Sequence, residues 1–534
     1  MPIEVATNQK PLDPAQTPAS AQPSGGFFPL SEWPLGVLLV LGIAMRFYRL
    51  GSQGIWLDES ITWGFARFPT GETIAAAFLD GHPPLHYLLV QATLFLLPTS
   101  ETAVRLVSAL SSALLLVTIA IHLRRHWGRR AAFYGVWFAA LSTFDLYFAQ
   151  EARMYALLAF LCFLAYALLI EALGDHPRLL LGWSTVTILT LWTHFYAIFV
   201  IGVFLFFVVA LWFWQHRKGR ALPITGRWLG LNVALILIGI APVIYALWQS
   251  RARQHGSAVI PGWSELGELF AVWSVGLTGA RVLFLDSSHL IFAALTDISL
   301  AQWVLIGCVT HGLPLVWGLV SGWRQDSRWH QSSLLSLLLL TMPVLAVLAY
   351  CHLFDLRSWN FRGFIAGAPL AYAWAGIGTS QLGKRSLRWG MAAIVLGVAL
   401  LSLIPYWSVW TKTPAPIAYR EIPPGQRSAL VLDRAYVAPE VFFYYGATTE
   451  ILGVVPRADG QFTFARVSFP GKTGHIVHTQ PIDGCRDGQM QQTTDLWLFG
   501  PMWRIRQDIS HWPACVWDYN LWVFEDGAWR VFVR

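Results

Sequence analysis

Residues 101–130 read ETAVRLVSALSSALLLVTIAIHLRRHWGRR, an almost wholly apolar run at 103–123 followed directly by a cluster of four arginines. About 20 apolar residues are enough to cross roughly 30 Å of hydrocarbon. A short basic cluster at the end of such a run is typical of a cytoplasmic loop. This stretch therefore predicts a transmembrane helix and its orientation together.

The composition of the whole chain agrees with a membrane protein. Of the 534 residues, 55% are hydrophobic and only 13% are charged, whereas a soluble domain carries about a quarter charged residues. The 28 Trp and 33 Phe fit a protein with two long membrane interfaces, where amphipathic rings gather. The net charge of +7 comes from short basic clusters between apolar runs, so we expect no nucleic-acid partner.

Further apolar runs predict a polytopic α-helical protein with about eleven transmembrane helices. The run from 179 to 215 is too long for one helix, and we expect it to divide near His194–Tyr196. The other runs lie near 33–49, 131–149, 153–174, 228–250, 301–321, 332–352, 361–381 and 387–410.

One apolar segment, residues 83–98, is short and begins with two prolines. If it crossed the membrane, the basic cluster at 124–130 would lie outside, and those at 217–220, 324–328 and 384–388 would change sides with it. If it only enters the outer interface, all four are cytoplasmic, as the positive-inside rule favours. We therefore predict a cytoplasmic N-terminus and an extracytoplasmic C-terminus in a plasma or inner membrane.

This topology divides the chain into three parts. Residues 1–28 are rich in Pro, Ala, Ser and Gln and are expected to form a disordered cytoplasmic tail. Residues 29–410 form the transmembrane part, with external loops at about 50–102 and 251–300. Residues 411–534 have normal polarity, and the segments ALVLDR, PEVFFYY, EILGVV, LWLF and LWVFEDGAWRVFV predict the strands of a small α/β domain outside the membrane.

Five cysteines are too few for a disulfide scaffold. Cys162, Cys308 and Cys351 lie in apolar spans and are interpreted as small core residues. Cys485 and Cys515 could form a disulfide in an extracytoplasmic domain, or could lie apart.

The first candidate motif is GIWLDES, residues 54–60, just after the first span. Adjacent carboxylates such as Asp58 and Glu59 are costly at a membrane boundary unless they are solvated, paired or used. In one interpretation, Asp58 or Ser60 caps an amphipathic surface helix over 60–79. In the other, the motif supplies an acid–base carboxylate beside an opening in the bilayer.

The second motif is GHPPLHY, residues 81–87. Its prolines are explained by an extended entry to a short helix, but its histidines are not. His82 and His86 could donate to a phosphate or ligate a metal. A divalent ion held by Glu59 and a histidine such as His82 is possible chemistry, although the sequence does not require a cofactor.

The third motif is DLYFAQEARMY, residues 145–155, in the expected external turn between two spans. Glu151 and Arg153 could form an interfacial ion pair, which is worth little in solvent. Alternatively, Arg153 could clamp a phosphate.

Two later segments add candidates to the same face. His194, in LWTHFY, could be either a core residue or a ligand. Arg357 and Arg362, in DLRSWNFR, are external cations that run against the usual charge distribution. The topology thus places all the main candidates outside: Asp58, Glu59, His82, Asp145, Glu151, Arg153, His194 and Arg362.

The order of these motifs resembles a known family. The segments are WLDES, GHPPLHYLL, ETAVRLVSALSSALLL, YFAQEARMYALLAF, LTLWTHFYA and FRGFIAGAPLAYAWAG. Together, over roughly residues 30–410, they resemble the bacterial membrane glycosyltransferases related to protein O-mannosyltransferases. The lipid A aminoarabinose transferase and the rhizobial lipopolysaccharide galacturonosyltransferases are the most similar members.

The resemblance implies the GT-C fold and a sugar donor linked to a polyprenyl phosphate. It also implies that Asp58 is the catalytic base and Glu59 its partner. Glu151 with Arg153 corresponds to the second-loop motif of the family, and Arg362 to a basic residue near the donor phosphate. We therefore expect Arg153, Arg362 and His194 to bind the donor phosphate, with supporting residues at His82, His86, Glu151, Tyr155 and Tyr196.

Two departures from the family pattern bear on the acceptor and on Arg362. The late segment reads Asn-Phe-Arg-Gly-Phe where relatives usually have Arg-Tyr before the proline. The β-trefoil insert of eukaryotic protein mannosyltransferases does not fit this length, which favours a lipid or a glycoconjugate over a protein as acceptor.

The expected function is therefore transfer of a sugar from a polyprenyl-phosphate donor to a hydroxyl of a lipid, lipopolysaccharide or other glycoconjugate. The transfer would take place on the outer face of the membrane, with inversion at the anomeric carbon. The alternative is a transporter or flippase of a lipid-linked glycan precursor, although transporters usually place polar groups near the midplane of repeated halves. A membrane scaffold that displays residues 411–534 is a third class, which leaves the clustered charges without a purpose.

Overall fold

The structure is a computed structural model. It describes residues 33–408 except Asp175, 220–223, 251–259, 277–298, 326, 355–358 and 360, and beyond 408 it describes Phe443 and seven strands. Arg357, Cys485 and Cys515 therefore lie outside the described residues, as does the expected N-terminal tail.

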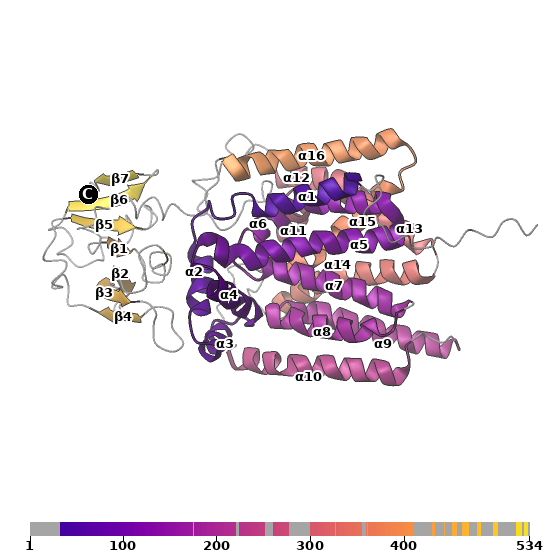
Figure 1. Cartoon of the computed structure of the whole chain (residues 1–534), viewed down its shortest axis with the longest axis horizontal. Helices are drawn as coiled ribbons and strands as arrows, with labels where there is room; N and C mark the ends of the chain where they lie inside the picture. Colours follow the sequence, from indigo (N-terminus) through magenta and orange to yellow (C-terminus); the bar gives the residue numbers. More distant parts are fainter. Residues whose placement is uncertain are drawn as a thin grey trace, which may run out of the picture.

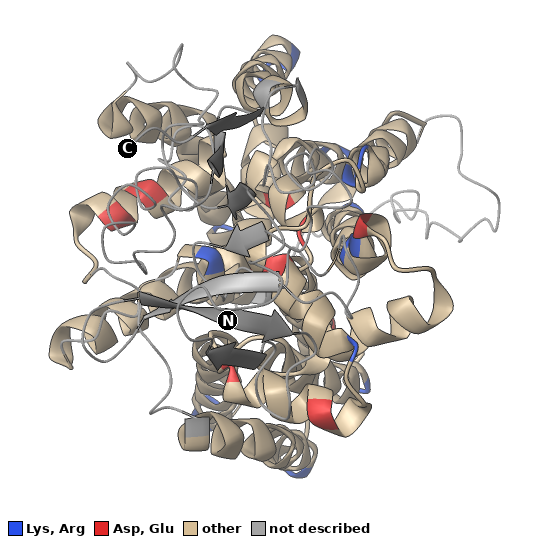
Figure 2. Ribbon diagram, turned by 90° about the vertical axis from the view of Figure 1, so that its left-hand side faces the viewer, with Lys and Arg blue, Asp and Glu red and all other residues tan. Residues whose placement is uncertain are grey.

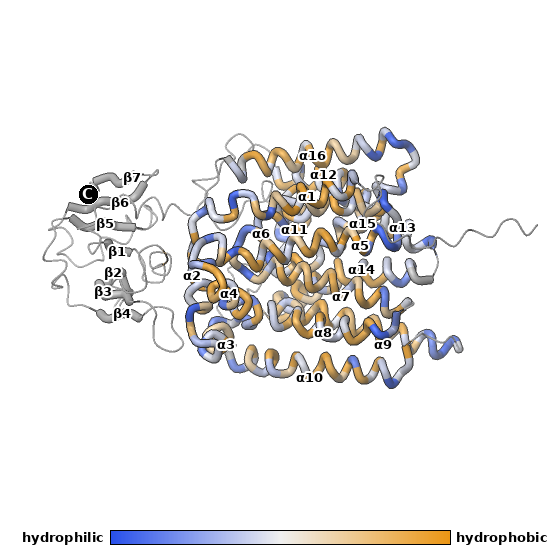
Figure 3. The backbone as a smooth tube through the Cα atoms, viewed as in Figure 1, coloured by the Kyte–Doolittle hydropathy of each residue, from blue (hydrophilic) through white to orange (hydrophobic). Residues whose placement is uncertain are grey.

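The described residues up to 408 form a bundle of helices (Figure 1). Most residues along these helices are apolar (Figure 3). The N-terminal half contains α1 (Trp33–Phe47), α2 (Leu57–Ala66), α3 (Thr70–Leu79), α4 (Leu85–Leu96), α5 (Glu101–Leu141), α6 (Thr143–Ala149), α7 (Tyr155–Leu173), α8 (Leu179–Thr193) and α9 (Ala197–Arg217). The second half contains α10 (Gly226–Ser250), α11 (Trp263–Val275), α12 (Leu300–Gly307), η4 (Cys308–Gly312), α13 (Leu313–Trp323), α14 (Ser327–Leu353), η5 (Phe361–Gly367), α15 (Ala368–Ser380) and α16 (Arg385–Ser408).

The chain is a multi-pass membrane protein. Among the described residues, 7 helices are long and apolar enough to cross a membrane, and α1, α4 and α8 are shorter apolar helices. α5 contains two of the expected spans, joined at Gly128, whose φ of 81° breaks the helix. The predicted division of 179–215 is confirmed, because α8 ends at Thr193 and α9 begins at Ala197. The total of eleven spans stays a prediction.

The interpretation of residues 60–79 as one capped surface helix is corrected. The single helix is two helices, because the chain breaks before Pro69, the N-cap of α3. Trp56 is the N-cap of α2, and no side chain caps that end, so the interpretation of Asp58 or Ser60 as a cap is wrong. The segment 251–300 contains α11, which packs against α12, and its position outside the membrane stays a prediction.

Close helix packing in the bundle depends on glycine, as is common in membrane proteins. α15 packs against α5, and a Cβ added at Gly376 would lie 2.2 Å from the backbone nitrogen of Gly135. Because the nearest atoms belong to the backbone of α5, this contact could be relieved only if one of the two helices moved.

We therefore expect Gly376→Val to lower the free energy of unfolding, since overpacking costs typically about 1–3 kcal/mol. Thermal unfolding of the purified chain in one detergent measures this. Gly390→Val is the matched control in α16, because an added Cβ there meets nothing within 4 Å. Equal melting temperatures of the two variants would contradict the close approach of α5 and α15.

The described strands form a 7-stranded sheet with the order β4-β3-β2-β1-β5-β6-β7. The inner strands β2, β1, β5 and β6 are parallel, and antiparallel partners close both edges. Figure 1 shows this sheet beyond the end of the bundle that carries α2. The strands are β1 (Leu430–Leu432), β2 (Ile451–Pro456), β3 (Phe462–Ser468), β4 (His478–Pro481), β5 (Asp495–Phe499), β6 (Asn520–Glu525) and β7 (Ala528–Val531).

Four of the predicted strand segments coincide with β1, β2, β5 and the β6–β7 hairpin, whereas β3 and β4 were not predicted. Parallel neighbours need long crossover connections, usually helical. Apart from Phe443, the residues that connect the parallel strands lie outside the described ones, so the helical half of the expected α/β domain stays a prediction.

Two of the three cysteines in the apolar spans, Cys162 and Cys351, are buried as expected. Cys308 is exposed on η4, so its interpretation as a core residue is wrong. A cysteine on the surface of a helix in an apolar span still behaves as a small apolar residue.

Candidate active site

The two ends of the bundle differ in composition. The end that carries α2, α3 and α4 also carries α6 and the connection from α8 to α9, and we call it the site end (Figure 1). The bend of α5, the last turns of α9 and α13 and the first turn of α16 lie at the other end, which we call the basic end (Figure 1). Viewed from the site end, some acidic and basic residues lie near the middle of the bundle and others toward its edge (Figure 2).

Asp58 lies in the first turn of α2 and faces Arg362, which is 304 positions later in the chain. The Nη1 of Arg362 donates to Oδ2 of Asp58 at 3.2 Å, and the side chains are 6% and 27% exposed, respectively. Asp58 is thus a carboxylate that is paired on one side and open on another. That is the environment a proton-accepting side chain needs.

Arg362 is held in place by aromatic rings and by a glycine. Its guanidinium carbon lies 5.7 Å from the ring centre of Trp56 and 5.9 Å from that of Tyr155. A Cβ at Gly363 would lie 2.6 Å from the ring of Tyr196, so η5 can approach Tyr196 only with glycine there. Tyr155 and Tyr196, both predicted supporting residues, therefore position the cation.

Arg153 is a second buried cation beside Asp58. Its Nη1 lies 3.4 Å from the backbone oxygen of Asp58 and 3.5 Å from the hydroxyl of Tyr87. Its Nη2 lies 3.3 Å from Nε2 of His82. Burial alone lowers the pKa of Arg153, but Tyr87 and Asp58 outweigh it and the net shift is upward. Arg153 therefore stays charged at every working pH.

His82 connects Arg153 to an acidic residue. Its Nδ1 lies 3.0 Å from Oδ2 of Asp80. An acceptor carboxylate on Nδ1 and a donor guanidinium on Nε2 assign the proton to Nδ1. His82 therefore accepts from Arg153 and orients its guanidinium.

Glu59 has a different environment from its neighbour Asp58. It is fully buried, and Arg105 donates to it through Nε (2.7 Å) and Nη2 (2.6 Å). The backbone N–H of Ala152 donates to the same carboxylate at 2.9 Å. This geometry favours a structural role for Glu59 over the catalytic role that was predicted for it.

Arg105 is a site residue that the motif analysis missed. Besides Glu59, it donates to the backbone oxygens of Leu50, Gln53 and Gly54 at 2.8–2.9 Å. A single arginine therefore fixes the chain before α2 and the start of α2 itself. An arginine inside an otherwise apolar span was the available signal, because such residues are rarely without a partner.

Two buried histidines at the site end are neutral. Burial, with Arg153 nearby, lowers the pKa of His86 to about 3. Burial, with His82 and Arg153, holds the pKa of His194 well below its usual value. The Nδ1 of His194 accepts from the backbone N–H of Tyr196 at 3.1 Å, so its proton lies on Nε2. His194 can donate to an oxygen but cannot supply positive charge.

The remaining predicted residues are buried around this cluster. Glu151 is buried and acts electrostatically on Arg362 and Tyr147. Asp145 is also buried, but its charged neighbour is Arg46 rather than Arg153 or Arg362. Burial raises the pKa of Asp145 to about 7, and Arg46 opposes that shift.

The described residues do not group into a metal site. Among them, no three His, Cys, Asp or Glu side chains lie together as possible ligands. Glu59 is bound by Arg105 and Ala152, and His82 by Asp80 and Arg153, so the pair suggested as metal ligands is engaged elsewhere.

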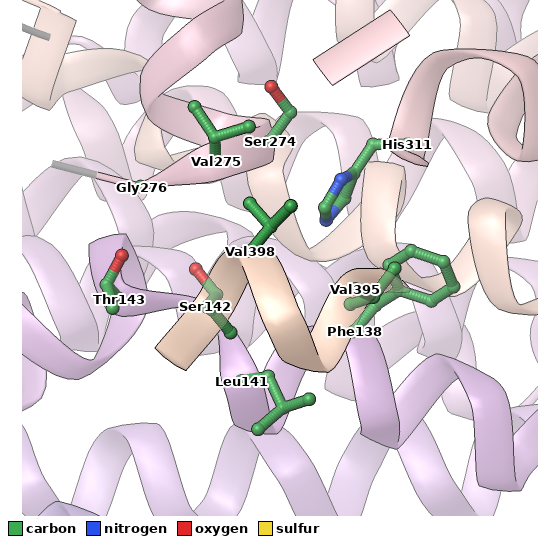
Figure 4. Close-up of a pocket in the computed structure, with 11 residues that line it drawn as sticks. Phe138, Leu141, Ser142, Thr143, Ser274, Val275, Gly276, His311, Val395 and Val398 are labelled. Atoms are coloured by element: carbon green, nitrogen blue, oxygen red, sulfur yellow. The ribbon is translucent and has the colours of Figure 1, made fainter. Parts of the chain in front are cut away.

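A cavity inside the bundle is separate from this cluster (Figure 4). His311 from η4, Ser274 from α11 and Ser142 and Thr143 at the α5–α6 junction line it, and its volume is about 10 Å³. That is about the volume of one water-sized sphere, far too small for a sugar.

Comparisons with known proteins support the fold and its class. The family of dolichyl-phosphate-mannose-protein mannosyltransferases matches residues 81–256, a range that contains His82, Arg153 and His194. No curated protein sequence is detectably similar to the chain.

The solved structures are similar at low identity. ArnT from Cupriavidus metallidurans in the apo state has 15% identity and a TM-score of 0.50, with 77% of this chain and 70% of that chain covered. The same protein bound to undecaprenyl phosphate has 16% identity and a TM-score of 0.46, with 78% of this chain and 70% of that chain covered. A third structure is AglB, an oligosaccharyltransferase from Archaeoglobus fulgidus, in complex with an inhibitory peptide and a dolichol-phosphate. It has 11% identity and a TM-score of 0.44, with 77% of this chain and 63% of that chain covered. The expected resemblance to GT-C membrane glycosyltransferases related to mannosyltransferases and to ArnT is confirmed.

Proposed function

We propose that this GT-C membrane protein transfers a sugar from a polyprenyl-phosphate donor to a hydroxyl of a lipid, lipopolysaccharide or other glycoconjugate acceptor. One observation carries the proposal. A partly exposed carboxylate, Asp58, pairs with Arg362, and a second buried cation, Arg153, contacts the backbone oxygen of the same residue. A base and an anion-binding pair are the two elements that sugar transfer from a lipid phosphate requires.

In the proposed reaction, the acceptor hydroxyl attacks the anomeric carbon of the sugar. As the new C–O bond forms, the bond from that carbon to the phosphate oxygen breaks, and the hydroxyl proton passes to Asp58. The leaving polyprenyl phosphate keeps the bonding electrons. A one-step displacement of this kind inverts the anomeric configuration.

Arg153 and Arg362 would stabilise the negative charge that develops on the departing phosphate. Arg362 also binds Asp58 in this structure, so a donor phosphate would compete with Asp58 for the same guanidinium. Donor binding would then loosen the ion pair and leave the carboxylate free to accept a proton. His194, with its proton on Nε2, is a neutral donor for a phosphate or sugar oxygen.

The donor class rests on the relatives. ArnT is a protein that binds undecaprenyl phosphate, and AglB one that binds a dolichol-phosphate. The predicted orientation puts the site end outside the cytoplasm, where such donors present their sugars to envelope acceptors. The paired candidates Asp58 and Arg362 belong to α2 and η5, and α2 lies at the site end of the bundle (Figure 1). A polar site at one end fits a transferase better than a flippase, which usually places polar groups near the midplane.

The test uses the purified full chain in detergent micelles, with the total lipid extract of cells that lack the protein as the substrate pool. We expect one lipid to gain the mass of a sugar residue while free polyprenyl phosphate appears, both measured by mass spectrometry. A flippase produces neither change, because it moves a lipid across a bilayer without making or breaking a covalent bond. If neither change occurs with this extract, but the missing glycan returns when the protein is restored to the cells, the transferase assignment is overturned.

A further inference from the structure

A large cavity lies at the basic end of the bundle, far from Asp58 along the helices (Figure 1). Its volume is about 860 Å³, and it lies where the start of α1, the bend of α5 and the start of α16 meet. Sites for small molecules typically occupy roughly 300–1,000 Å³. The cavity is therefore large enough for a polar head group.

Four arginines line this cavity, which we call the arginine cavity: Arg129 and Arg130 from α5, and Arg385 and Arg388 from α16. The positive φ of Gly128 turns the chain immediately before Arg129. Arg388 donates to the backbone oxygens of Leu382 and Gly383. The bend at Gly128 and the contacts of Arg388 thus help to place arginines of α5 and α16 at one cavity.

Among the described residues, the lining contains no acidic side chain. Four arginines around one cavity concentrate positive charge there, and the planar guanidinium favours phosphate oxygens. The positive-inside rule explains why arginines lie at this end. It does not explain why four of them surround a cavity.

The other walls indicate a lipid rather than a soluble anion. Trp127 and Trp389 line the cavity, and indole rings are typical of the level of lipid head groups. Further along the chain from the cavity-lining residues, α1 exposes Val37 and Val40 and α16 exposes Ile394. Apolar surface therefore continues from the cavity along both helices. Acyl chains can follow this surface while the phosphate lies among the arginines.

We propose that the arginine cavity binds the phosphate head group of an anionic phospholipid. Basic pockets between membrane helices commonly bind such head groups. This site is distinct from the donor site at Asp58, and the proposal does not depend on the function proposed above.

The experiment measures lipid binding to the purified full chain by native mass spectrometry. Phosphatidylglycerol is the probe, and phosphatidylcholine with the same acyl chains is its uncharged comparison. We expect at least about tenfold tighter binding of phosphatidylglycerol. The double variant Arg130→Gln/Arg385→Gln should weaken it by about 30-fold, because each surface arginine contributes about 1 kcal/mol to anionic lipid binding.

The matched control is Arg217→Gln/Arg227→Gln, which removes two exposed arginines from α9 and α10 at the same end but outside the cavity. It should leave phosphatidylglycerol binding unchanged, and both variants should keep the wild-type melting temperature. Equal binding of the two lipids, or equal losses in the two variants, would overturn the proposal. So would displacement of the lipid by inorganic phosphate at a similar concentration, which would identify a soluble-anion site.

Discussion

Replacing Asp58 by Asn is expected to reduce the turnover number of sugar transfer by about 10²- to 10⁴-fold, the range that a positioned general base contributes. The amide oxygen can still accept the hydrogen bond that Arg362 now donates to Asp58 at 3.2 Å. Position is therefore kept while proton acceptance is lost. The measurement is the initial rate in detergent, with the affinity for the donor expected to change little because Arg153 and Arg362 remain.

The matched control for this variant is Glu72→Gln. Glu72 is an exposed carboxylate in the first turn of α3, at the same end of the bundle, and its loss should not affect the rate. Both variants should unfold at the wild-type temperature. A wild-type rate for Asp58→Asn would remove Asp58 from the role of base, and a loss of donor affinity without a loss of turnover would assign it to binding instead.

Several site residues could be predicted because they sit at helix ends. The positive-inside rule needs only the order of apolar runs and basic clusters, and it placed Asp58, Arg153, His194 and Arg362 on one face. The structure brings these residues to one end of the bundle. Their pairing was beyond the sequence, because the contact between Asp58 and Arg362 joins positions 304 residues apart.

The role of Glu59 could not be predicted for the same reason. Two adjacent carboxylates in WLDES look equivalent in sequence, but successive helical residues face different directions. Asp58 consequently faces Arg362, whereas Glu59 faces Arg105 in the body of α5. The different roles of Asp58, the candidate base, and Glu59, the anchor, become visible only when α2 is seen packed against α5.

The strands beyond residue 408 show the limits of local pattern. β1, β2, β5 and β6 have strongly apolar segments and were predicted, whereas β3 (FTFARVS) and β4 (HTQP) are more polar. These two strands lie toward one edge of the sheet, and edge strands often carry polar and charged residues. Their strand structure depends on pairing with a neighbour, which the sequence does not show.

The second large effect is expected from Arg105→Leu, which should lower the free energy of unfolding by about 3–5 kcal/mol. Removing one partner of a buried ion pair leaves an uncompensated charge, here the carboxylate of Glu59. The backbone oxygens of Leu50, Gln53 and Gly54 also lose their donor, and each unsatisfied buried group adds to the cost. Thermal unfolding in one detergent measures the loss. Hydrogen exchange over residues 50–66 locates it.

Glu59→Gln should be milder, because Gln can still accept from Arg105, whose charge remains close to three backbone oxygens. In Glu59→Leu/Arg105→Leu, stability should partly recover relative to Arg105→Leu, since no charge stays buried alone. Recovery should be incomplete because the backbone oxygens remain without their donor.

These variants distinguish an anchor from a catalyst. If Glu59 only holds the chain in position, the rate of Glu59→Gln should fall only in proportion to its loss of stability. Glu59→Asp keeps the charge, but its shorter side chain cannot reach Arg105, so neither its rate nor its stability should equal that of the wild type. If Glu59 takes part in the chemistry, Glu59→Gln should lose its rate at an unchanged melting temperature. The packing predicts the first pattern, because the Glu59 carboxylate is fully buried and accepts from both Arg105 and the backbone N–H of Ala152.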